Sequence, residues 1–149
     1  MNSNPSLSPL ECSLLYPVFG MVLLTVIVWL RMYYVRIGEI RSRRLDPQDL
    51  ATALKGAKLL QEVGPADNFR NLFEAPVLFY ALIPLLLISG CASSIQVFLA
   101  WLYVALRAAH SFIHATYNRV IHRFAVYAAS TLVLFAMWGM FAYAVITRT

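Results

Sequence analysis

Apolar residues fill four long stretches of this 149-residue chain, and charged residues gather between the stretches. A helix needs about 20 largely apolar residues to cross the hydrocarbon of a bilayer. No stretch alternates apolar and polar residues with the period of two that a β-barrel strand requires. The pattern therefore predicts an all-α, integral-membrane four-helix bundle that forms one domain, 1–149, with spans at residues 14–34, 72–89, 95–117 and 124–147.

Polar and helix-breaking residues predict how the spans are joined. The small residues of Ser89–Ser94 predict a tight turn, so the second and third spans form a helical hairpin. The loop at residues 36–68 is the only long hydrophilic segment. Within it we expect a solvated extension of the first helix at Arg41–Arg44, a turn or helix start at Asp46–Asp49, a helix at Leu50–Glu62, a break at Gly64-Pro65 and a helix cap at Asp67 or Asn68.

Composition and charge support a membrane protein and predict its orientation. Hydrophobic residues make up 60% of the chain and charged residues only 13%, against roughly 25% in soluble proteins. Basic residues concentrate in two loops, and such loops face the cytoplasm. They are Arg36, Arg41, Arg43, Arg44, Lys55 and Lys58 in the first loop, and Arg119 and Arg123 in the last. We expect a multi-pass protein of a bacterial inner membrane, with both termini outside the cytoplasm.

The same topology accounts for the net charge of +5, so nucleic-acid binding is not expected. The expected partner is the lipid bilayer. Cys12 and Cys91 both fall on the predicted outer side, where a disulfide could form in an oxidising compartment. Two unrelated thiols are the favoured interpretation, because neither cysteine has a charged neighbour that would make it reactive.

A first polar stripe marks the start of the second span. It consists of Asp67, Arg70, Asn71 and Glu74, which are three or four residues apart and so share one face of a helix. An arginine, an amide and two carboxylates can bind a zwitterionic ligand with a peptide bond. The alternative is an ion pair between Arg70 and Glu74 that merely ends the span at the membrane surface.

A second polar stripe lies at the end of the third span, with Tyr127 near it in the fourth. Two histidines four residues apart could bind a metal together with Glu74. The crowding of cations favours an anion instead, and no metal is expected. Side chains that reach to the membrane surface are the alternative, but Arg107 lies about three turns from the loop. The members of this second stripe are Arg107, His110, His114 and Tyr117.

These motifs carry a resemblance to a known family. Arg70-Asn-Leu-Phe-Glu74 before an apolar helix, Arg107-Ala-Ala-His110, and Arg123 followed by Tyr127 resemble the MAPEG superfamily of membrane-associated proteins in eicosanoid and glutathione metabolism. The resemblance extends over most of the chain. It implies a four-helix bundle that assembles as a homotrimer, with active sites between subunits near the cytoplasmic side.

The resemblance also implies roles for individual residues. Glutathione would be the thiol co-substrate, Arg123 would stabilise its thiolate as the catalytic residue, and the thiolate would attack a lipophilic electrophile or a peroxide. A thiol pKa near 8.5 falls by two units for about 2.7 kcal/mol, which one guanidinium can supply. The remaining site residues implied by the resemblance or by the two stripes are Arg41, Arg70, Asn71, Glu74, Arg107, His110, His114, Tyr117 and Tyr127.

Three positions depart from the pattern of well-studied members. Asp67 stands in place of an arginine, His114 in place of a tyrosine and Phe124 in place of a serine. The chief hypothesis is a membrane-embedded glutathione-dependent transferase or peroxidase. The alternative is a non-catalytic membrane subunit that uses the same fold to pack in a larger membrane complex.

Overall fold

The computed structural model describes residues 7–50, 60 and 62–148, and over these residues the chain is helical without a β-strand, as predicted. The expected helix at Leu50–Glu62 lies largely outside the described residues. At Asp46–Asp49, where a turn or a helix start was expected, a short 3-10 helix begins at Pro47. The elements are α1 (Pro9–Arg43), η1 (Pro47–Leu50), α3 (Gly64–Asn71), α4 (Pro76–Ile88), α5 (Ser94–Ala115) and α6 (Val120–Ile146).

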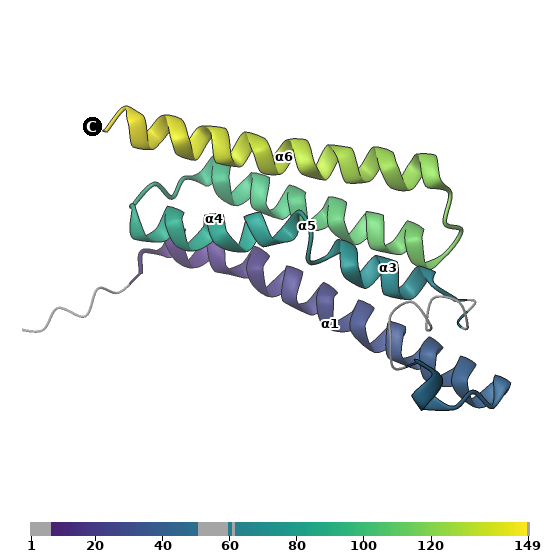
Figure 1. Cartoon of the computed structure of the whole chain (residues 1–149). Coiled ribbons are helices and arrows are strands. Elements are labelled where there is room, and N and C mark those ends of the chain that lie inside the picture. The colour runs from purple at the N-terminus through teal and green to yellow at the C-terminus, as the bar shows by residue number, and fades with distance from the viewer. Residues whose placement is uncertain (1–6, 51–59, 61, 149) are drawn as a thin grey trace, which may run out of the picture.

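Four helical segments are long and apolar enough to cross a membrane (Figure 1). Three of them, α1, α5 and α6, are single helices, and α1 is the longest. Helices α3 and α4 follow one another to form the second segment. All four run along one another and form a bundle. The prediction of an integral-membrane four-helix bundle is therefore confirmed.

The two ends of the bundle have different contents (Figure 1). One end holds the start of α1, the turn between α4 and α5, and the end of α6. The other end holds α3 and the connection from α5 to α6. Both polar stripes belong to this second end, away from the start of α1 and the end of α6.

The first helix is longer than a membrane is thick. At 1.5 Å per residue its 35 residues extend about 50 Å, against about 30 Å of hydrocarbon. A capping box between Ser8 and Glu11 begins α1, and Arg44 ends it in the left-handed conformation with φ 51°. The part of α1 that includes Arg41 thus extends past the bundle, in agreement with the predicted extension.

Apolar side chains form one buried core between the helices. Phe79 of α4 stacks on Tyr103 of α5 with ring centroids 4.9 Å apart, and both rings are fully buried. Leu14 and Met21 contribute from α1, and Leu134 from α6. Many large apolar residues remain exposed on the outside, where lipid is the solvent.

The second span is broken, which corrects the predicted helix at residues 72–89. Helix α3 already begins at Gly64-Pro65, the expected breakpoint, and neither Asp67 nor Asn68 caps it. The chain then leaves the helical path between α3 and α4. Pro76 explains the break, because it lacks the N–H that the carbonyl of Leu72 would need in a continuous helix. The first polar stripe is therefore not on one continuous helical face.

Arg31 of α1 stabilises the bundle at the end that holds the stripes. Its Nη2 donates to the carbonyl of Ala115 at the end of α5, at 2.8 Å. A cation at a helix C-terminus also interacts favourably with the helix dipole. We expect Arg31→Met to lower the free energy of unfolding by about 1–2 kcal/mol, measured by thermal unfolding in detergent. Arg36→Met, on the extension of α1, is the matched control, and an equal effect of both changes would contradict the prediction.

Candidate functional site

The second polar stripe points into the bundle. Arg107, His110 and His114 of α5 are only 0%, 2% and 5% exposed. Side chains that reached to the membrane surface would be accessible at their polar ends. Burial in the protein interior therefore replaces that interpretation for these three residues.

Arg107 lies at the break between α3 and α4. Its Nη2 donates to the carbonyl of Asn71, the last residue of α3, at 2.6 Å. Its guanidinium carbon lies 5.5 Å from the centre of the Tyr127 ring. Nε and Nη1 are buried and have no hydrogen-bond partner among the described residues. A buried cation with two unpaired donors is suited to an anionic ligand.

His110 joins three helices through its two ring nitrogens. Nδ1 lies 3.1 Å from the carbonyl of Arg123 in α6, so Nδ1 must carry the proton. Nε2 then accepts a long hydrogen bond of 3.5 Å from the Nδ2 of Asn71. The ring also lies against Tyr127, with centroids 5.7 Å apart. His110 thus fixes the Asn71 side chain at the broken helix.

Arg123 is oriented by two acceptors. Its Nη1 donates to Nε2 of His114 at 3.1 Å and to Oδ1 of Asn118 at 2.9 Å. Since a guanidinium only donates, His114 must present a lone pair and is neutral in this contact. Asn118 has φ 46°, a left-handed conformation that asparagine tolerates well. Sequence reasoning did not assign Asn118 a role in the site, although an asparagine in a turn between two helices is a signal for this conformation.

A cavity of about 170 Å³ brings residues of three helices together. It lies beside the broken second span and is open on one side. Asn71, His110, Arg123 and Tyr127, all named from the sequence, share it with two apolar residues. The complete lining consists of Asn71, His110, Val120, Arg123, Phe124 and Tyr127.

Arg70 and Glu74 of the first stripe lie outside this cavity and are exposed. The Arg70 guanidinium is 4.0 Å from the carboxylate of Asp67, in place of the considered pair with Glu74. Both partners are well exposed, so this ion pair contributes little to stability.

Tyr117 does not belong to the second stripe, which corrects the prediction. Helix α5 ends at Ala115, so the helical spacing does not continue to residue 117. The Tyr117 hydroxyl instead lies 3.4 Å from Nδ1 of His122, and Tyr117 is exposed. The predicted position of Tyr117 on the stripe requires a helix that continues two residues past Ala115.

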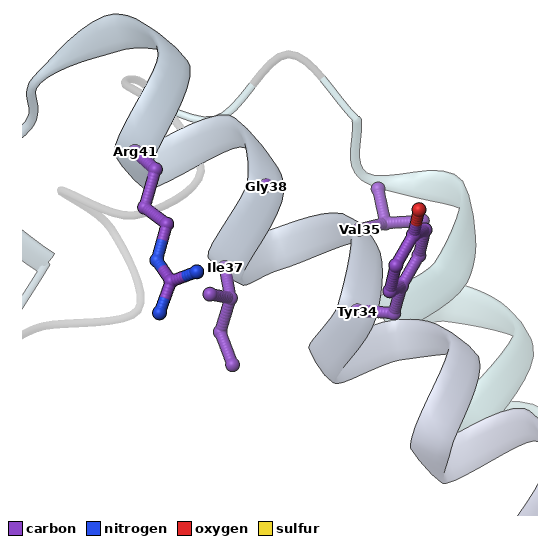
Figure 2. Close-up of a pocket in the computed structure, with 5 residues that line it drawn as sticks. All are labelled: Tyr34, Val35, Ile37, Gly38 and Arg41. Carbon is purple, nitrogen blue, oxygen red and sulfur yellow. The ribbon is translucent and has the colours of Figure 1, made fainter.

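Arg41 lies on the extension of α1, away from the cavity at Arg123. A separate, open cavity of about 550 Å³ follows one side of this extension, and Arg41 and Tyr34 lie at its two ends (Figure 2). A Cβ atom added to Gly38, between them, would meet nothing within 4 Å. Within one chain Arg41 therefore remains separate from the other candidate residues.

Asn68 is a further buried polar residue between α3 and α5, for which the sequence suggested only a capping role. Its Nδ2 donates to the carbonyl of Ser111 at 3.3 Å. The Oδ1 of Asn68, the Oγ of Ser111 and the Nδ1 of His114 are buried and unpaired within the described part of the chain. The stripe on α5 is thus backed by a polar layer toward α3.

The described residues offer no group of three metal-binding side chains. The Nε2 atoms of His110 and His114 both face N–H donors, from Asn71 and Arg123. Their lone pairs are therefore engaged, which does not favour a metal bound by the two histidines and Glu74.

Comparison with known proteins assigns the family. No curated protein and no solved structure matches the chain. A family model described as MAPEG family matches residues 14–143. The match covers all four spans, both polar stripes and the cavity at Arg123. The chain therefore belongs to the MAPEG family.

Proposed function

We propose that this protein is a membrane-embedded, glutathione-dependent transferase or peroxidase that acts on lipophilic electrophiles. The observation that carries the proposal is the cavity in which Arg123, His110, Asn71 and Tyr127 converge beside the broken second span. MAPEG proteins include glutathione transferases, and family members commonly use glutathione. The donors in and beside the cavity suit a ligand with negative charge.

Arg123 is the residue proposed to stabilise the thiolate. Both of its hydrogen bonds use Nη1, so Nη2 and Nε make none with other described residues. A guanidinium held in this way presents fixed positive charge without accepting a proton. It lowers the pKa of a nearby thiol, and the released proton goes to solvent. The sulfur then displaces a leaving group from an electrophilic carbon, or adds to an activated double bond whose neighbouring carbon takes a proton from solvent. With a hydroperoxide the sulfur attacks one oxygen, the O–O bond breaks and the alcohol leaves after protonation by solvent. A second glutathione then condenses with the resulting sulfenic acid to give the disulfide and water.

The other candidate residues would bind the remainder of glutathione. Arg107 offers two buried donors, Nε and Nη1, for a carboxylate. Asn71 can pair with a peptide bond, and Glu74 with the ammonium group of the γ-glutamyl end. Arg70 adds positive charge at the exposed rim. His110, which holds Asn71, acts as a positioning residue.

The size of the cavity supports assembly as a homotrimer. Sites for small molecules usually measure about 300–1,000 Å³, more than the about 170 Å³ present beside Arg123. A neighbouring subunit would complete the wall on the open side, and Arg41 would be its basic contribution. Light scattering of the detergent-solubilised protein should give the mass of three chains.

The direct test of the proposal is titration calorimetry with glutathione, followed by a conjugation assay with a lipophilic electrophile. We expect saturable binding at micromolar to millimolar glutathione and thiol-dependent turnover. S-methylglutathione, which cannot form a thiolate, is the control and should bind without turnover. Absence of both binding and turnover at millimolar glutathione would contradict the proposal.

One observation favours the second hypothesis, a non-catalytic subunit of a larger membrane complex. Asp67 lies 4.0 Å from Arg70 and neutralises part of the positive charge that a glutathione carboxylate would meet. Native purification distinguishes the two hypotheses. A stoichiometric partner would support a subunit of a larger complex, and a trimer without a partner would support an enzyme. Asp67→Asn should strengthen glutathione binding if the enzyme reading holds.

The proposed site would face the cytoplasm of a bacterium, where glutathione is made. The basic residues of the loop at 36–68 support this orientation by the positive-inside rule. The start of α1 and the end of α6, at the other end of the bundle in Figure 1, would then lie outside. A protease added to intact spheroplasts should remove a C-terminal epitope tag. A tag that is protected from the protease would indicate the opposite orientation of the protein in the membrane.

Asn118 provides a test of how Arg123 is held. Asn118→Gly keeps a residue that tolerates φ 46° but removes the Oδ1 acceptor at 2.9 Å from Arg123. We expect about tenfold slower conjugation at neutral pH, because a hydrogen bond to a charged group contributes about 1.5 kcal/mol. The measurement is the initial conjugation rate at saturating electrophile. A wild-type rate would show that His114 alone orients Arg123.

A further inference from the structure

A second cavity lies at the opposite end of the bundle from the proposed glutathione site. It measures about 310 Å³ and is built from the α4–α5 turn, the start of α5 and the end of α6, which meet at one end of the molecule in Figure 1. No residue of either polar stripe lines it. Its described lining includes Cys91, Gln96, Met140, Tyr143, Ala144 and Arg148.

Gln96, one of the lining residues of this cavity, has an unpaired hydrogen-bond acceptor. Its side chain is only 2% exposed, and its Nε2 donates to the carbonyl of Met137 in α6 at 3.0 Å. Its Oε1 is buried and has no partner among the described residues. The hydrogen bond that joins α5 to α6 uses the amide nitrogen of Gln96. It gives no structural role to the amide oxygen of the same side chain. A buried acceptor of this kind calls for a donor from a ligand.

Arg148 brings a fixed positive charge to the same cavity. Its Nη1 and Nη2 donate to the carbonyls of Ser89 and Gly90, at 2.9 and 3.0 Å. These contacts hold the guanidinium over the α4–α5 turn. None of the described lining residues is acidic, so the charge is not neutralised within the cavity. The cavity is thus lined by a residue with a buried, unpaired acceptor and by a cation.

The position of the cavity at the ends of the spans places it at the level of lipid head groups. Its volume of about 310 Å³ suits a head group without acyl chains. Exposed apolar side chains of α5 beside its start, Ile95 and Phe98, offer an outer surface for the chains. A phosphate would meet Arg148, and a donor on the head group would reach Gln96.

We propose that this cavity binds the head group of a membrane phospholipid whose phosphate carries a hydrogen-bond donor, such as ethanolamine or glycerol. Phosphatidylcholine shares the phosphate but has no N–H or O–H on its head group. The cavity should therefore distinguish phosphatidylethanolamine from phosphatidylcholine through Gln96. This assignment is independent of the proposed thiol chemistry.

Cys91 is a built-in reporter for the test. It lines the cavity, is 9% exposed and is a free thiol. The full chain carrying Cys12→Ser has Cys91 as its single thiol. Alkylation of Cys91 by N-ethylmaleimide would be timed in nanodiscs, which leave both membrane faces accessible. Nanodiscs of pure phosphatidylcholine would be compared with nanodiscs that contain phosphatidylethanolamine or phosphatidylglycerol.

We expect alkylation to be about tenfold slower with either donor-bearing lipid, since one hydrogen bond to a buried acceptor can contribute a tenfold preference. Ala144→Leu, which fills the cavity, should abolish the lipid dependence, and so should Gln96→Met. Ala144→Leu leaves the hydrogen bond between Gln96 and Met137 in place, whereas Gln96→Met removes it. Comparison of the two variants therefore separates loss of the cavity from loss of packing between α5 and α6.

Equal alkylation rates in all nanodiscs would overturn the proposal, as would a lipid dependence that persists in the Ala144→Leu variant. Soluble glycerophosphoethanolamine, added to phosphatidylcholine nanodiscs, tests the source of the phosphate. Absence of protection by the soluble ester supports a lipid ligand, and full protection by it would overturn the lipid assignment.

Discussion

Replacing Arg123 with leucine should slow glutathione conjugation about 25-fold at pH 7. A guanidinium that lowers the thiol pKa by about two units, from about 8.5 to about 6.5, raises the thiolate fraction at pH 7 by this factor. Without Arg123 the thiol returns to a pKa near 8.5, so the deficit should shrink as the pH rises from 7 and nearly vanish above about pH 9. The measurement is the pH dependence of the conjugation rate, together with the thiolate absorbance of bound glutathione.

Arg119 provides the matched control. It precedes Arg123 by one helical turn, is exposed and lies outside the cavity. Arg119→Leu removes the same charge from the same loop and should keep the rate within about twofold, because an exposed charge is strongly screened. Arg123→Lys keeps the charge but loses the contact geometry, so we expect an intermediate rate. A wild-type pH profile for Arg123→Leu would exclude Arg123 as the thiolate-stabilising residue.

The four spans could be predicted from the sequence because lipid burial depends mainly on composition and length. The break in the second span could not, although Pro76 is visible in the sequence. A proline in the first turn of a helix does not interrupt that helix, since the N–H groups of the first turn have no partner within the helix. At the break, the Asn71 carbonyl accepts a hydrogen bond from Nη2 of Arg107, which comes from a different helix. That contact joins residues 36 positions apart and leaves no local signal.

The candidate site was predictable in part, because some of its residues lie on one regular helix. Helical spacing correctly aligned Arg107, His110 and His114, because these residues share one regular helix. The spacing failed at Tyr117, where α5 has already ended. The hydrogen bonds from Arg123 to His114 and Asn118 depend on how the α5–α6 connection turns, which periodicity does not describe.

Arg107 presents the sharpest competition between stability and binding. Burying an ion costs several kcal/mol even after relaxation of the protein. One hydrogen bond to the Asn71 carbonyl contributes about 1.5–3 kcal/mol, and the contact with the Tyr127 ring up to about 2 kcal/mol. Nε and Nη1 contribute nothing in the ligand-free chain, because they have no partner among the described residues. The favourable contacts therefore do not fully offset the cost of burial.

We accordingly expect Arg107→Met to raise the melting temperature of the ligand-free protein by about 2–4 °C, equivalent to about 1 kcal/mol. The same change should remove most of the additional stabilisation that millimolar glutathione gives the wild type. Thermal unfolding in detergent, with and without glutathione, measures both effects. Arg31→Met is the informative contrast, because it should lower the melting temperature and leave the response to glutathione intact. A less stable Arg107→Met variant with a normal glutathione response would instead make Arg107 a structural clamp on the broken helix, with no part in binding the ligand.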